Sequence, residues 1–189
     1  MSRLDPHPSH GTEIGPARPD EVASLPEIER RAAALFPDSV LPAALAAQTT
    51  PEVELAEAQR EGLLFVLRIA SGDVIGFARL VRIDAGLHLE ELDVDPAQGR
   101  RGHGRRLLET VCAWARDRGF PSITLSTFRD VPWNAPFYSS AGFRILAPEE
   151  WTSSLVQLRE RERRQGLDVE RRVLMLRSLA RSESGVRPG

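Results

Sequence analysis

The sequence contains no lysine: all 25 of its cationic side chains are arginines, set against 27 acidic residues for a formal net charge of −2. The missing lysine excludes a Walker-type P-loop, a protein kinase and a pyridoxal phosphate enzyme, because each of these needs a lysine for its chemistry. The near-neutral charge argues against a dedicated nucleic-acid binder, which is normally strongly basic. A genome-wide preference for arginine codons is the simplest reason for the absence, but the exclusions hold whatever its origin.

Cysteine, histidine and long apolar runs are also scarce. Cys112 is the only cysteine and there are four histidines, so no internal disulfide and no zinc-site spacing is available. The longest apolar stretch, residues 63–67, is far shorter than the roughly 18–20 residues that span a bilayer. Residues 1–11 lack the apolar segment of a secretory signal; His7 and His10 leave a metal role open there, but a disordered leader is favoured. We expect a soluble, cytoplasmic protein with no metal and with neither a membrane nor a nucleic-acid partner.

Periodicity and turn residues predict one α/β domain over residues 12–179, followed by a disordered tail at 180–189. A short strand over 12–17 precedes a helix that starts at Pro19 and is kinked at Pro26, and a second helical stretch over 40–60 is broken near Pro51 with Thr50 as N-cap. Further strands are expected at 63–69, 74–83, 87–94, 122–128, 142–146 and 172–179, and further helices at 105–118, 134–140 and 152–165, the last mostly solvated. The strands from 63 to 94 predict an antiparallel meander, and the strand–helix–strand unit from 87 to 128 implies a parallel pair.

A glycine-rich loop precedes the helix expected at 105–118. Residues 98–106 hold three glycines, four arginines and no acid. Small residues let backbone N–H groups approach an anion, and the following helix directs its positive end at the same place. The loop therefore predicts an anion cradle that suits a pyrophosphate. The dinucleotide fingerprint G-x-G-x-x-G fits poorly, because counting from Gly102 puts Leu107 where the last glycine belongs.

Two segments resemble the GCN5-related N-acetyltransferase (GNAT) superfamily. Residues 92–108 read Leu-Asp-Val-Asp-Pro-Ala-Gln-Gly-Arg-Arg-Gly-His-Gly-Arg-Arg-Leu-Leu and are similar to the family's central motif, Q/R-x-x-G-x-G/A between a strand and a helix. Residues 134–143, Asn-Ala-Pro-Phe-Tyr-Ser-Ser-Ala-Gly-Phe, are similar to its second motif, which joins an asparagine, a tyrosine and a Gly-Phe pair. One position departs: the Gln or Arg expected before the first motif glycine falls on Gly99, with Gln98 one place early. The resemblance covers roughly residues 13–179.

The resemblance implies a mixed, mostly antiparallel α/β sheet with one parallel, splayed strand pair and flanking helices. It also implies acetyl-CoA as the donor and an amine as the acceptor. Strands 87–94 and 122–128 would separate to admit the pantetheine, and Asn134 would reach that arm. Backbone groups of Leu92, Asp93 and Val94 would pair with the pantetheine and polarise the thioester carbonyl. The pyrophosphate would be held by the backbone of Arg100, Arg101, Gly102, His103, Gly104 and Arg105, with His103 acting as a spacer.

The family pattern also suggests the proton-transfer groups. Tyr138, the only tyrosine, would protonate the departing CoA thiolate; the motif favours this role over the alternative, a core aromatic beside Phe137. Glu90 and Glu91 are the predicted bases, with His88 or a water chain behind them, and each of these three side chains also fits a solvated strand.

The faces of the strand that carries these groups depend on its regularity. Strict alternation puts His88 and Glu90 on one face with Leu92 and Val94, and Glu91 on the other, whereas a bulge would swap those faces.

The sequence as a whole predicts an acetyl-CoA-dependent N-acetyltransferase that works by direct attack of the amine, without a covalent enzyme intermediate. Phe128, Arg129 and Trp133 either line the acceptor pocket or cap the fold. Two alternatives stay open: a catalytically silent CoA-binding sensor or interaction module, against which Asn134 and Tyr138 count, and an arginine-rich nucleic-acid binder. The acceptor, a preference for a longer acyl-CoA and the oligomeric state, including a homodimer, are left undetermined.

Overall fold

The computed structural model describes residues 11–179. All but the last residue of the expected leader, including His7 and His10, and the whole expected tail lie outside the described residues. Within the described part, seven strands form one sheet in the order β1-β2-β3-β4-β5-β7-β6, antiparallel except for β4 and β5. This confirms the predicted fold class.

The strands are β1 (Thr12–Pro16), β2 (Leu64–Ile69), β3 (Val74–Ile83), β4 (Gly86–Val94), β5 (Ser122–Phe128), β6 (Arg144–Ile145) and β7 (Arg172–Ser178). The helices are α1 (Leu25–Ala33), α2 (Ala43–Ala46), α3 (Glu52–Arg60), α4 (His103–Asp117), α5 (Ala135–Ser140) and α6 (Ser153–Arg164). Short 3-10 turns are η1 (Pro19–Ser24), η2 (Pro96–Gln98), η3 (Pro148–Glu150) and η4 (Val169–Arg171).

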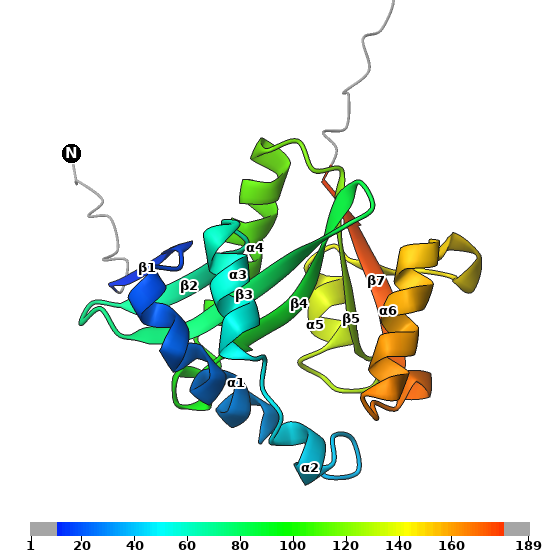
Figure 1. Ribbon diagram of the computed structural model, residues 1–189, viewed down its shortest axis with the longest axis horizontal. Coiled ribbons are helices and arrows are strands. Elements are labelled where there is room, and N and C mark those ends of the chain that lie inside the picture. Colours follow the sequence, from blue (N-terminus) through cyan, green and yellow to red (C-terminus); the bar gives the residue numbers. More distant parts are fainter. Residues whose placement is uncertain (1–10, 180–189) are drawn as a thin grey trace, which may run out of the picture.

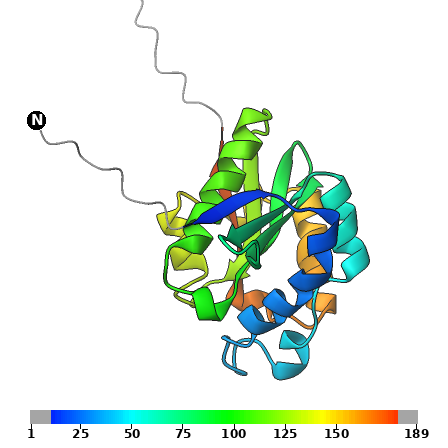
Figure 2. The same cartoon turned by 90° about the vertical axis from the view of Figure 1, so that its left-hand side faces the viewer.

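Alternating apolar residues give the sheet a core on each face. On one face, Phe65, Leu80 and Leu125 belong to a continuous core that includes residues of α4 and α5. The other face carries two separate cores, one beneath η1, α1 and α3 and one beneath α6. Figure 2 shows α4 on one side of the sheet and α1, α3 and α6 on the other. The second face is therefore covered in two blocks, with β4 and β5 between them.

The parallel pair in the middle of the sheet separates along its length. β4 and β5 are paired only at 87–89 with 123–125; beyond these residues β4 continues with β3 alone and β5 with β7 alone. Figure 1 shows the two strands diverging between α1 and α6. The expected splay is thus present.

Local boundaries differ from the sequence expectations in ways that have physical causes. The N-cap of α3 is Pro51, not Thr50, because the Thr50 N–H and hydroxyl bond the Glu29 carboxylate instead. The chain from Pro19 forms a 3-10 turn before α1, and Pro26 lies in the first turn of α1, where its missing N–H costs no hydrogen bond within the helix.

The remaining differences concern element lengths. The helix expected from 105 begins at His103, and the strand expected at 142–146 shortens to β6, which pairs only with β7 at the sheet edge. The helix expected to be mostly solvated, α6, buries Leu155, Leu158 and Glu162.

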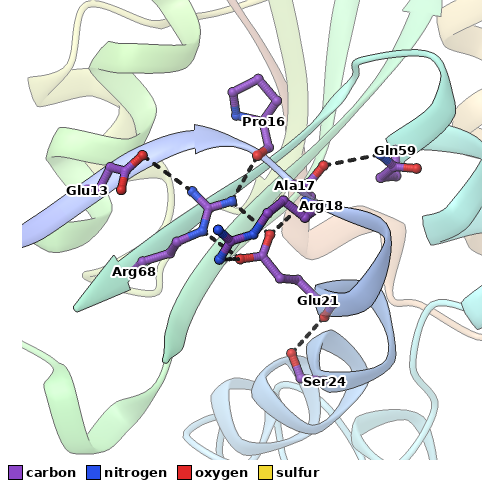
Figure 3. Close-up of polar contacts among 8 residues, drawn as sticks. All are labelled: Glu13, Pro16, Ala17, Arg18, Glu21, Ser24, Gln59 and Arg68. Atoms are coloured by element: carbon purple, nitrogen blue, oxygen red, sulfur yellow. Dashed lines mark hydrogen bonds and ion pairs between the residues drawn. The ribbon is translucent and has the colours of Figure 1, made fainter. Parts of the chain in front are cut away.

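A buried ion pair fixes the N-terminal segment to the sheet. Arg68, only 6% exposed, bonds Glu21 through Nε–Oε1 at 2.5 Å and Nη2–Oε2 at 2.7 Å, and donates to the Pro16 carbonyl at 2.9 Å. Glu21 also accepts from the Arg18 N–H at 2.6 Å (Figure 3). The Arg68 guanidinium, opposed by burial and assisted by Arg18, lowers the pKa of Glu21 to about 2.

Candidate active site

A cleft of about 1510 Å³ lies over the divergent halves of β4 and β5. Its walls are α1 with the segment 34–51 on one side and α6 on the other, and the loop before α4 forms one end. Most of the sheet residues that line it are polar, unlike their neighbours under the helices, and they include Arg79, His88, Glu90, Glu91, Asp93 and Ser126. A polar floor between two apolar cores marks this cleft as the candidate site.

A β-bulge in β4 determines which side chains enter the cleft. The β3–β4 register shifts after Arg79, whose partner is Glu91, and Glu90 is left as the extra residue. Leu92 packs against the core on the α4 side, while Glu90 and Glu91 both line the cleft. The grouping of Glu90 with Leu92 by strict alternation is therefore wrong, and the bulge alternative is confirmed.

Glu90 and Glu91 have different partners. The Glu90 side chain is 9% exposed and forms ion pairs with Arg79 and, at 2.5 Å, with Arg161 of α6. Glu91 has no hydrogen bond or ion pair within residues 11–179, and burial, followed by the charges of Asp93 and other nearby carboxylates, raises its pKa well above the ordinary value. Glu90 is thus held as a counter-ion, whereas Glu91 is free to exchange a proton.

Asp93 is a second carboxyl group without a partner. Its Oδ2 is buried and accepts no hydrogen bond within the described chain. Burial, and then the charge of Glu29, raise the pKa of Asp93 well above its ordinary value.

His88 lies where β4 and β5 are still paired. Its Nδ1 is 2.9 Å from Thr124 Oγ1, and that hydroxyl lies 3.2 Å from the Leu87 carbonyl, to which it donates. Nδ1 is then the donor to Thr124, and Nε2 carries the lone pair. Burial of the ring, which is 2% exposed, lowers the pKa of His88 to about 4, so it is neutral at physiological pH.

Helix α5 brings Asn134 and Tyr138 to the opposite side of the gap. Asn134 Nδ2 donates to Thr127 Oγ1 on β5 at 2.7 Å. The Tyr138 ring packs between Phe137 and Phe143, with centroids 5.1 and 5.7 Å apart, and still lines the cleft. Burial, then Asp93 and Glu91, raise the pKa of Tyr138, so its hydroxyl keeps its proton throughout the physiological range.

The loop before α4 is shaped by two left-handed residues. Arg100 has φ +61° and Gly102 φ +78°, and successive N–H groups in such a turn form a concave anion nest. A Cβ on Gly104 would meet only Val94 Cγ2, at 3.9 Å, so packing inside the protein does not require glycine there. The bare backbone at Gly104 instead lines the cleft.

The loop arginines are not equally available. Arg101 donates to Gln98, Arg105 to Ser140, and Arg106 to Thr12. Arg100 has no partner within residues 11–179. His103 is 9% exposed and its buried Nδ1 has no partner in the described part either; burial, then Arg106, lower the pKa of His103.

Aromatic residues line the outer part of the cleft. Phe36 packs against Phe128 and Trp133, with ring centroids 5.5 and 5.8 Å apart, and all three line the cleft. Phe128 and Trp133 therefore line the cleft, as one of the two interpretations of this segment expects, whereas Arg129 is not in the lining.

Several cleft side chains could not be identified from the local sequence. Glu29 falls on the apolar stripe of α1 beside Ile28, and a charge in such a stripe is a usable signal that was missed. The local sequence around Arg79, Arg161 and Arg172 gives no comparable indication, because each pairs with a carboxylate from a different element of the fold.

Residues 27–143, more than half of the chain, match the acetyltransferase (GNAT) family. The chain belongs to the GNAT family. As a GNAT-family member it is an N-acyltransferase. The match contains both motif segments, Glu29 and the β4 carboxylates, whereas α6 and β7, with Arg161 and Arg172, lie beyond it.

Solved structures share the GNAT fold of this chain. The PaiA N-acetyltransferase from Thermoplasma acidophilum, in complex with coenzyme A, is 16% identical with a TM-score of 0.64, over 89% of this chain and 99% of that one. The ribosomal-protein-S18-alanine N-acetyltransferase from Escherichia coli is 18% identical with a TM-score of 0.64, over 94% and 99%. N-acetylglutamate synthase from Neisseria gonorrhoeae, complexed with coenzyme A and N-acetyl-glutamate, is 17% identical with a TM-score of 0.69, over 90% and 35%. At these sequence identities the comparisons show a shared fold and nothing about the substrate.

Membranes and metals were also considered for this GNAT chain. No helix in the described range is both long enough and apolar enough to cross a bilayer. Among residues 11–179, no group of three or more His, Cys, Asp or Glu side chains is placed to hold a metal ion.

Proposed function

We propose that this GNAT-family protein transfers an acetyl group from acetyl-CoA to an amine by direct attack of the amine on the thioester. The observation that carries the proposal is the separation of β4 and β5 beside the nest at Arg100 and Gly102. The gap leaves an edge of β4 without a strand partner beyond residue 89, where an extended pantetheine can pair with backbone groups of Leu92, Asp93 and Val94.

The residues at the donor end fit the chemistry of coenzyme A. The nest N–H groups and the N-terminus of α4 suit a pyrophosphate, and the unpartnered Arg100 supplies a further cation for the phosphates. The open space at Gly104 lets a phosphate approach the backbone. In this proposal Asn134 bonds the pantetheine arm, and its hydrogen bond to Thr127, which fixes the side chain beside β5, supports that role.

Two side chains then move the protons of the reaction. Bound acetyl-CoA supplies an activated acyl group, and the new C–N bond forms as the C–S bond breaks. Glu91, unpaired and with a raised pKa, accepts the proton that the attacking amine loses. Tyr138, whose raised pKa keeps its hydroxyl protonated, donates to the departing thiolate. Glu90 positions this part of the bulge through Arg79 and Arg161.

The test is release of free thiol from acetyl-CoA with a panel of amines. Tyr138→Phe should lower kcat about a hundredfold or more while leaving the Kd for CoA within about twofold, because only the proton donor is lost. Glu91→Gln should abolish the acidic limb of the pH–rate profile, since a base with a raised pKa loses activity as pH falls through that pKa. Unchanged turnover in Tyr138→Phe would refute the assigned acid.

The two alternatives predict different results in the same assay. A CoA-binding sensor binds acetyl-CoA but releases no thiol with any amine. A nucleic-acid binder is retained on a polyanion in a salt-sensitive way that acetyl-CoA does not compete away.

A further inference from the structure

The carboxyl groups of the cleft fall into two classes. Six line it: Glu29, Glu54, Glu90, Glu91, Asp93 and Glu162. Arginines neutralise three of them, because Arg79 pairs with Glu54 and Glu90, Arg161 also pairs with Glu90, and Arg172 pairs with Glu162. Within residues 11–179, Glu29, Glu91 and Asp93 have no arginine within 4.0 Å.

The unpaired carboxyl groups face the same space. Glu91 and Asp93 are two residues apart on β4, after the bulge, and therefore share the face that is covered by α1, from which Glu29 reaches in. Glu29 is 9% exposed, and its oxygens receive only neutral donors, the Thr50 N–H at 2.9 and 3.0 Å and the Thr50 hydroxyl at 3.2 Å. Asp93 Oδ2 is buried and has no hydrogen-bond partner in the part of the chain that the structure describes. A buried carboxylate without a cation is costly, and a ligand cation removes that cost.

Only one of these three groups is used by the transfer reaction. Glu91 serves the nitrogen that is acetylated, which leaves Glu29 and Asp93 without a cationic partner among residues 11–179. Building on the proposed function, we propose that the acceptor is a small linear diamine or polyamine whose second ammonium binds between Glu29 and Asp93.

The shape of this part of the cleft favours a small alkyl amine over a protein terminus. The segment 34–51 reaches across to the end of α6: Arg171 donates to the Ser39 carbonyl, and a Cβ on Gly166 would lie 3.5 Å from Leu45 Cδ2. Leu41, Leu45 and Phe36 line the cleft there and suit a methylene chain between two charged nitrogens.

Calorimetry on the CoA-loaded protein tests the second ammonium independently of turnover. We expect 1,4-diaminobutane and 1,5-diaminopentane to bind about tenfold to a hundredfold more tightly than butylamine and pentylamine, the range expected for charge-assisted hydrogen bonds. Asp93→Asn and Glu29→Gln should each reduce that ratio about tenfold, while the monoamine Kd stays within about twofold. Glu54→Gln is the matched control, because that carboxylate lines the same cleft but is paired with Arg79; its ratio should not change.

Each result decides between the two proposals. A diamine-to-monoamine ratio below about threefold, or a ratio that neither Asp93→Asn nor Glu29→Gln alters, overturns the diamine site, whether or not monoamines are acetylated. Thermal melting of each variant shows that it is folded, and Asp93→Asn, which removes no hydrogen bond, keeps the test decisive if Glu29→Gln unfolds. Diamine binding that depends on Asp93, with no thiol release from acetyl-CoA for any amine, supports the diamine site and overturns the proposed transfer.

Discussion

The buried ion pair between Glu21 and Arg68 predicts a stability change that can be worked from its geometry. Glu21→Gln keeps the size of the side chain but removes the charge that two arginine N–H groups contact at 2.5 and 2.7 Å. A pKa lowered from 4.5 to about 2 corresponds to roughly 3 kcal/mol of folding stability at neutral pH. Because the neighbouring Arg18 side chain is 59% exposed and admits solvent, we expect the measured loss at pH 7 to be about 2 kcal/mol.

The same pair sets the direction of the pH dependence. A carboxyl group whose folded pKa is depressed contributes its full stability above its unfolded pKa, and this contribution is lost as the pH falls toward the folded pKa. For Glu21 the window runs from about pH 5 to about pH 2. The destabilisation caused by Glu21→Gln should therefore be largest near pH 7 and shrink by more than half at pH 3.

Urea unfolding at pH 7, 5, 4 and 3 measures both quantities. Glu27→Gln is the matched control, because Glu27 also pairs with an arginine, Arg30, but both side chains are about half exposed. We expect Glu27→Gln to change the free energy of unfolding far less than Glu21→Gln. Equal effects of the two variants at pH 7, or an effect of Glu21→Gln that is the same at pH 3 and pH 7, would refute the reasoning.

Two further predictions concern the nest and the single thiol. Gly104→Val should leave the melting temperature nearly unchanged, since a Cβ there meets only Val94 at 3.9 Å, but should weaken CoA binding about tenfold or more by calorimetry. Gly104→Ala should give a smaller loss, and equal CoA affinity in all three proteins would contradict the proposed phosphate approach. Burial raises the pKa of Cys112 to about 11, so iodoacetamide at pH 7.5 should label it slowly in the native protein and rapidly in urea. Fast native labelling would show that this part of the core opens.

The donor half of the site could be predicted because its elements are contiguous in sequence. The nest, the start of α4 and the residues of β4 that are proposed to pair with the pantetheine all lie between Leu92 and Arg105, and glycine and proline spacing indicates such backbone geometry directly. The parallel pairing of β4 and β5 could also be predicted, because a strand–helix–strand connection places its two strands parallel in the same sheet. Asn134 and Tyr138 could be predicted because both lie in the second motif, residues 134–143.

The acceptor half could be predicted only in part, because side chains from distant elements form it. Whether Glu90 or Glu91 is free depends on the bulge and on Arg161, which α6 supplies from 71 residues away. The burial of Arg68 has the same origin: it follows Val66 on the strand face that lies beneath η1, α1 and α3, and it pairs with Glu21 of η1, which no local sequence pattern indicates. Alternation along a strand assigns faces correctly until one extra residue intervenes.

The absence of lysine bears on the carboxyl groups of the cleft that no arginine pairs with, Glu29 and Asp93 among them. Three of the arginines that line the cleft, Arg79, Arg161 and Arg172, each hold a carboxylate through a planar guanidinium, and Arg79 and Arg161 together pair with Glu90. No lysine exists whose flexible ammonium could swing into the space between Glu29 and Asp93 and mimic the acceptor. On the proposed binding mode, a dicationic ligand therefore meets no competition from a lysine side chain at Glu29 and Asp93.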